Sequence, residues 1–147
     1  MREILFRGKR TDNGEWVYGY VGIAFTIDEN KKVKSRHFTA LDCLGWSSQV
    51  LVSDETIGQY TGLCDKNGVR IFEGDIVLYG TNTNRAKNKE THEVVFETRG
   101  GSGYFGIRIS EIETWKFCLE VPAKLMEVIG NIHDKTELLK GGADNDR

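Results

Sequence analysis

The side chains best suited to catalysis or metal binding are few and scattered. The chain has three histidines and three cysteines, at His37, His92, His133, Cys43, Cys64 and Cys118. None of them has the Cys-x-x-Cys or His-Glu-x-x-His spacing of metal sites, and each histidine stands alone in its segment. We therefore expect reduced structural thiols, no metal, no cofactor and no catalytic residues, so that the protein is not an enzyme. A deep pocket joining a histidine to Asp75 or Cys64 would change this expectation.

An acidic turn at Asp65-Lys66-Asn67-Gly68 raises the question of a calcium loop. An EF-hand loop needs oxygen ligands at its first, third and fifth positions and glycine at its sixth. Counted from Asp65, glycine arrives at the fourth position and Val69 occupies the fifth, so the ligand set is incomplete. Asn-Gly is also a strong hairpin signal, which favours a structural turn here.

The glycine-rich segment Arg99-Gly100-Gly101-Ser102-Gly103 is the remaining candidate for a ligand-binding loop. It lacks the Lys-Ser/Thr that completes a phosphate-binding P-loop, and it does not join a strand to a helix. We interpret it as a hairpin turn.

Aromatic side chains alternate along one expected strand. Trp16, Tyr18 and Tyr20 share a face by the two-residue period of a strand, with Val17 on the opposite face. Such a ladder could stack on nucleic-acid bases, with about 1 to 3 kcal/mol per stacked base. The alternative, which the composition of ordinary strands favours, is that these aromatics pack into the core.

Basic side chains gather around the segment 31–37, at the tip of an expected hairpin. A phosphate or an acidic partner could bind there, although charged hairpin tips are commonly just solvated and protect strand edges. With the aromatic ladder and a polar loop at Thr81–Lys89, the candidate binding surface is Trp16, Tyr18, Tyr20, Lys31, Lys32, Lys34, Arg36, Arg85 and Lys87. The formal net charge is −2, so the chain lacks the strongly basic character of a dedicated duplex binder.

Short apolar runs separated by glycine turns predict an all-β fold. The chain has 17 glycines and one proline. Hairpins are expected at 3–10 with 15–24, at 25–27 with 33–38, and at 92–98 with 104–109, followed by strands at 115–121 and 125–132. Asp134 with Glu137 suggests a capping box that opens a short C-terminal helix ending at Gly141.

The 147 residues suit a single domain built from two small β units. We place the N-terminal unit at 1–55, the C-terminal unit at 56–140 and a frayed tail at 141–147. No apolar run approaches the roughly 18 residues of a membrane helix, and the first residues do not form a signal peptide. The expected location is the cytosol of a bacterial host.

Three blocks of sequence resemble the YopX family of small phage and prophage proteins. They are Ile4–Arg10 with Trp16-Val17-Tyr18-Gly19, then 57–62 through Glu73-Gly74-Asp75-Ile76-Val77, and 127–132. The resemblance covers the chain from about Ile4 to Leu139. It implies an all-β protein whose C-terminal half is an SH3-like barrel, and it supplies no catalytic residues.

The resulting functional hypothesis is a non-enzymatic binding module that serves as a phage or prophage accessory protein. The alternatives are a self-assembling structural protein and a single-stranded nucleic-acid binder. We expect a protein partner or self-association before nucleic acid, no membrane, and possible assembly into a homo-oligomer.

Overall fold

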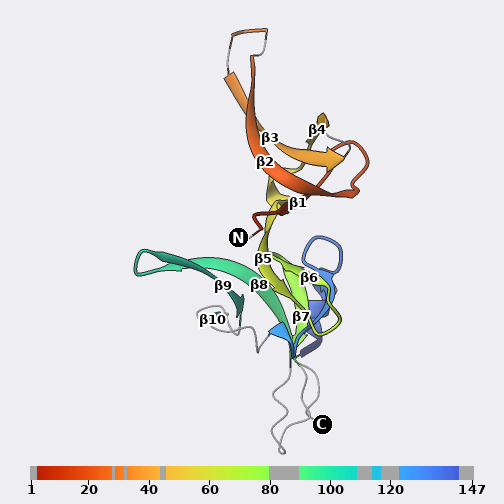
Figure 1. Cartoon of the computed structure of the whole chain (residues 1–147), viewed down its shortest axis with the longest axis vertical. Coiled ribbons are helices and arrows are strands. Elements are labelled where there is room, and N and C mark those ends of the chain that lie inside the picture. The colour runs from red at the N-terminus through yellow and green to blue at the C-terminus, as the bar shows by residue number, and fades with distance from the viewer. Residues whose placement is uncertain are drawn as a thin grey trace, which may run out of the picture. The chain divides into compact units, whose positions relative to one another are not determined.

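The computed structural model describes residues 3–27, 29–31, 33–43, 46–79, 90–108, 114–116 and 123–142. The chain divides into two units, Met1–Tyr60 and Thr61–Arg147. Antiparallel strands dominate both, as the sequence analysis predicted, and the helices described are short 3-10 segments (Figure 1). The fold is therefore all-β.

The first unit is a sheet of hydrogen-bonded strands in the order β4-β3-β2-β1-β5. Its elements are β1 (Phe6–Lys9), β2 (Trp16–Ile27), β3 (Val33–Cys43), β4 (Trp46–Leu51), the 3-10 turn η1 (Asp54–Thr56) and the start of β5 (Gly58–Cys64). The pairing of β1 with β2 and of β2 with β3 confirms the first two predicted hairpins.

The turn between β1 and β2 follows from its Asn-Gly sequence. Gly14 has a φ of 72°, a left-handed conformation that glycine adopts without steric cost. The turn is closed by hydrogen bonds from the Arg10 N–H to the Glu15 carbonyl (2.9 Å) and from the Gly14 N–H to the Arg10 carbonyl (3.0 Å). The register that follows pairs Lys9 with Trp16.

The core of the first unit is thin on the face of β1 and β2 that carries Gly8 and Val17. Val17 and Val52 are buried there, and a Cβ placed on Gly8 would lie 3.1 Å from the Cβ of Val52. Thr56 fastens the end of β1, since its hydroxyl oxygen accepts a bond from the Lys9 N–H (2.8 Å) and donates to the Ser53 carbonyl (2.7 Å). At Gly8 this face has room only for a very small side chain.

The second unit holds a five-stranded antiparallel sheet in the order β10-β9-β8-β7-β11. Its elements are β6 (Arg70–Phe72), β7 (Asp75–Tyr79), β8 (Glu90–Arg99), β9 (Ser102–Arg108), β10 (Thr114–Lys116), β11 (Glu127–Asn131) and the 3-10 helix η2 (Thr136–Gly142). The pairing of β8 with β9 around Gly100 and Gly101, both with positive φ, confirms the predicted glycine-rich hairpin turn.

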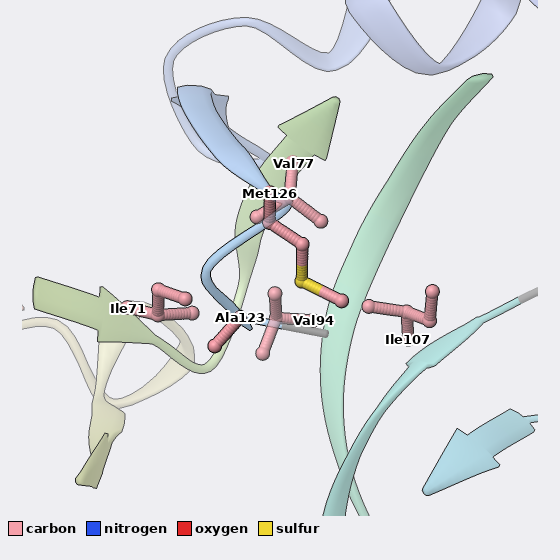
Figure 2. Packing of buried hydrophobic residues seen from close by; sticks show 6 residues of the cluster. All are labelled: Ile71, Val77, Val94, Ile107, Ala123 and Met126. Atoms are coloured by element: carbon pink, nitrogen blue, oxygen red, sulfur yellow. The ribbon is translucent and has the colours of Figure 1, made fainter. Parts of the chain in front are cut away.

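Aliphatic side chains from several strands fill the core of the second unit. The buried cluster is Ile71, Val77, Val94, Ile107, Ala123 and Met126. Figure 2 shows the Met126 side chain extending toward Ile107 beside Val94. Each fully buried side chain of this size contributes about 1.5 to 3 kcal/mol relative to exposure. β7 begins with three consecutive buried residues, so the start of this strand is covered on both faces.

Two more detailed predictions can be compared with the structure, namely the SH3-like barrel and the C-terminal helix. Within the described residues the sheet of the second unit has two edges, β10 and β11, so the SH3-like barrel is not confirmed. The predicted C-terminal helix is a 3-10 helix, Thr136–Gly142, and the Asp134 carboxylate accepts a bond from the Asn131 amide (2.8 Å) in the preceding turn. The predicted loop Thr81–Lys89 and the tail 143–147 lie outside the described residues.

Candidate binding face and buried carboxylates

One face of the β1–β2 hairpin brings together aromatic and cationic side chains. Trp16 lies opposite Lys9 and Tyr18 opposite Arg7 in the strand register, and Tyr20 follows on the same face by the strand period. We call Arg7, Lys9, Trp16, Tyr18 and Tyr20 the hairpin face.

Both cations of the hairpin face lie against the indole ring of Trp16. The guanidinium carbon of Arg7 is 4.7 Å from the ring centroid, and the Nζ of Lys9 is 5.5 Å from it. Cation–π contacts of this kind contribute about 0.5 to 2 kcal/mol, depending on their exposure to water. The indole ring is thus engaged within the protein itself.

The tyrosines of the hairpin face point to solvent. Tyr18 is 47% exposed and Tyr20 is 57% exposed. Val17, which lies between Trp16 and Tyr18 in the sequence, is buried. The favoured alternative of the sequence analysis, in which these aromatics fill the core, is therefore wrong for Tyr18 and Tyr20. The opposite face carries Gly8 and Val17, which pack against Val52 in the core.

The structure describes only some of the basic residues of the predicted binding surface. Lys31 is exposed at the tip of the β2–β3 hairpin with a φ of 60°. Lys34 and Arg36 belong to β3, but only their backbone is described, and Lys32, Arg85 and Lys87 lie outside the described residues. The structure thus groups Trp16, Tyr18 and Tyr20 without placing the predicted basic side chains beside them.

Sequence reasoning missed the two cations that complete the hairpin face. Arg7 and Lys9 are separated by one residue, the spacing that puts side chains on the same face of a strand. The Asn-Gly turn fixes the register that sets them against Trp16. Combining the alternation with the turn would have found them.

The carboxylate of Asp65, the residue considered for calcium, is a structural acceptor. Its Oδ1 accepts bonds from the backbone N–H groups of Asn67 (2.8 Å) and Val69 (2.9 Å), and its Oδ2 accepts one from Val128 (2.9 Å). Burial by itself raises the pKa of Asp65, but the three N–H donors with the charge of Lys66 outweigh it, so that the pKa lies below its ordinary value. The turn reading is supported, and the carboxylate ties β11 to the β5–β6 turn.

A family profile described as "YopX protein" matches residues 5–140, which is most of the chain. The chain belongs to the YopX family. This confirms the resemblance found in the sequence.

Comparison with other proteins adds little about the role of this YopX-family chain. The crystal structure of protein EF1440 from Enterococcus faecalis is similar to it at 28% sequence identity, with 95% of this chain and 99% of that chain covered and a TM-score of 0.49. A search among curated proteins finds no significant match.

The histidines of the YopX-family chain can be placed in part. His92 is buried, with Nδ1 3.1 Å from the Arg108 carbonyl oxygen and Nε2 3.8 Å from a Glu90 carboxylate oxygen. Asp75 is 1% exposed, and its Oδ2 accepts a bond from the Phe72 N–H at 2.7 Å. Asp75 is therefore committed to the bend at Gly74 and does not face solvent.

In the described residues of this YopX-family chain, no three histidine, cysteine, aspartate or glutamate side chains gather in a way that could hold a metal ion. Nor do those residues include a helix long and apolar enough to cross a membrane.

Proposed function

We propose that this YopX-family protein is a non-enzymatic binding module that contacts a protein partner through its hairpin face. The observation that carries the proposal is the exposure of Tyr18 and Tyr20 on strand β2, next to Trp16 with Arg7 and Lys9 against its ring. Tyrosine and tryptophan are enriched at the centres of protein interfaces, and the buried Arg7 lies against Trp16. Their ordering in β2 reduces the entropy lost on binding.

The contacts already made by the Trp16 ring favour a protein partner over nucleic acid. A base that stacks on Trp16 would have to compete with the Arg7 and Lys9 contacts to its ring. Tyr18 and Tyr20 are exposed, and their rings offer apolar area together with a hydroxyl group, which suits a protein surface. We place the activity in the cytosol of a bacterial host, as part of phage or prophage biology.

A photoreactive phenylalanine analogue at position 20 tests the proposal. The matched control places the same analogue at Phe96, which is 45% exposed in the second unit. We expect a protein adduct of defined mass from phage-infected host cells with the analogue at position 20, absent with the analogue at position 96 and lost when Tyr18→Ala is added. Equal adducts at both positions, or none at position 20, would refute the hairpin face as the binding surface. An adduct of twice the mass of the chain would identify self-assembly instead.

Single-stranded nucleic acid is the second candidate function, because Lys9 adds positive charge beside the aromatic side chains. We would titrate the protein against labelled single-stranded DNA, duplex DNA and RNA, following anisotropy at low and near-physiological salt. Binding that weakens steeply with salt and is lost in Lys9→Glu and Tyr20→Ala would replace the protein-partner proposal. Under our proposal, none of the three ligands binds at near-physiological salt.

Closure of the C-terminal unit into an SH3-like barrel is part of the same proposal, as the scaffold implied by the family. Its support is the link between the β5–β6 turn and the segment around β11, through the bond from the Lys66 N–H to the Met126 carbonyl (3.1 Å) and the bond from the Val128 N–H to Asp65. Cross-strand NMR contacts between β6 and β10 would establish closure. Solvent-exchanging amides along both strands, without such contacts, would establish an open sheet.

A further inference from the structure

The two Asn-Gly turns of this chain are chemically alike but structurally different. In an Asn-Gly pair the backbone nitrogen of glycine can attack the side-chain carbonyl carbon of asparagine, since glycine has no side chain to obstruct the approach. A bond forms between that nitrogen and Cγ, the bond from Cγ to Nδ2 breaks, and ammonia leaves. Water then opens the resulting succinimide to aspartate or to isoaspartate. No oxidant, metal or enzyme is required.

At Asn13 the fold holds the side-chain amide at both ends. Its Nδ2 donates to a carboxylate oxygen of Glu15 at 2.8 Å, and its Oδ1 accepts from the Glu15 N–H at 3.0 Å. The amide must give up both bonds before its carbonyl carbon can turn toward the nitrogen of Gly14. Two hydrogen bonds, one of them to a charged group, therefore oppose the reaction.

At Asn67 the side-chain amide is exposed and forms no hydrogen bond with another described residue, while its backbone N–H is bound to Asp65. A Cβ placed on Gly68 would meet nothing within 4 Å, so space for the succinimide ring is present on that side. We propose that Asn67 is a site of spontaneous succinimide and isoaspartate formation in the folded protein, and that Asn13 is protected from it.

The glycine nitrogens do not account for this difference. The Gly14 N–H donates to the Arg10 carbonyl and the Gly68 N–H to the Asp65 carbonyl, each at 3.0 Å. Both glycines also have similar positive φ angles, 72° and 81°. Protection of Asn13 therefore resides in its side-chain amide and in Glu15.

The modification has a structural consequence in the second unit. Isoaspartate lengthens the main chain by one methylene between residue 67 and Gly68, whereas the single Oδ1 of Asp65 binds the N–H groups of both Asn67 and Val69. The longer chain cannot keep both bonds, and a new carboxylate lies close to that of Asp65. The turn that carries the Val128 contact is thereby weakened.

The test is incubation of the full-length folded protein in mildly alkaline buffer, followed by peptide mapping with mass spectrometry that separates aspartate from isoaspartate. We expect modification at residue 67 several-fold faster than at residue 13. In urea the two rates should converge, because both asparagines precede glycine. Equal rates in the folded protein, a faster rate at residue 13, or no reaction at residue 67 while the unfolded chain reacts would each overturn the proposal.

Two variants separate the parts of the argument. Glu15→Ala should raise the rate at residue 13 several-fold and leave residue 67 unchanged; no increase at residue 13 would overturn the protection by Glu15. Asn67→Asp introduces the charge without the longer main chain. The isoaspartate form should unfold at lower urea concentration than Asn67→Asp, and equal unfolding of the two would overturn the proposed effect on the turn.

Discussion

The carboxylate of Asp65 allows a quantitative test of how the second unit is held together. Asp65→Asn keeps an oxygen for the N–H groups of Asn67 and Val69 but turns an NH₂ group toward the N–H of Val128. One bond to a charged acceptor is lost and two donors then face each other, so we expect a loss of about 2 to 3 kcal/mol in the free energy of unfolding. Asp65→Ala removes all three acceptor contacts and should cost about 3 to 5 kcal/mol.

The pH dependence of this effect follows from the lowered pKa of Asp65. A carboxyl group whose pKa is depressed by folding contributes stability that is fully present above its unfolded pKa of about 3.9 and is lost as the pH falls through its folded pKa. The difference between wild type and Asp65→Ala should therefore be constant near neutrality. It should shrink as the pH is lowered below about 4.

The assay is urea-induced unfolding followed by circular dichroism over a pH series, with amide hydrogen exchange as a local readout. In Asp65→Asn the amide of Val128 should lose its protection, while that of Val69 keeps most of it. Asp12→Asn is the matched control, because the Asp12 side chain is 61% exposed and its pKa is lowered by its hydrogen bond with Arg10. It should leave the urea midpoint close to that of the wild type. An Asp65→Asn effect as small as this, or unchanged exchange at Val128, would refute the reasoning.

Four further predictions concern single positions and are checked by urea unfolding, with the midpoint and slope compared to wild type. Gly74→Ala should cost about 1 to 2 kcal/mol, because φ at this buried position is 78° and an L side chain is strained there; an unchanged midpoint would contradict this. Gly130→Ala should cost about 1 kcal/mol, since its Cβ would lie 3.1 Å from Leu138 Cδ1; a stabilised variant would show that the contact relaxes freely. Lys31→Asn should gain up to about 1 kcal/mol by relieving a lysine at φ 60°, and a loss would count against strain at this tip. Tyr20→Ala should change stability by less than about 0.5 kcal/mol; a larger loss would mean that the exposed ring supports the fold.

The predicted hairpins rest on turn chemistry that is local in the sequence. Asn13-Gly14 and Gly100-Gly101 place left-handed residues where the chain reverses, and the flanking alternation then sets the strands. β5 contains Gly58 and Gly62, and Gly62 has a φ of 87°, which is outside ordinary strand geometry. Gly58 is buried opposite Arg7 in the ladder, a long-range reason for glycine that local propensity does not contain.

The side to which the aromatic ladder points could not be read from periodicity. A two-residue period states that Trp16, Tyr18 and Tyr20 share a face, but either face can be the core. Val17 is buried on the other face, where Gly8 lies close to Val52, 44 residues away in the sequence. Such a contact depends on the tertiary fold, so the exposure of Tyr18 and Tyr20 emerges only from the structure.

The first block of the family signature includes part of the hairpin face, whereas the central block serves the fold of the second unit. In the central part of the signature, Asp65 and Asp75 accept backbone N–H bonds while Gly74 supplies a left-handed bend, and each of these roles is satisfied within the second unit. Acceptors already bound to the backbone have little capacity left for a ligand. Tyr18 and Tyr20 instead expose apolar surface that the core does not use. Mutations in the central block of the signature should consequently report on folding, and mutations of the hairpin tyrosines on partner binding.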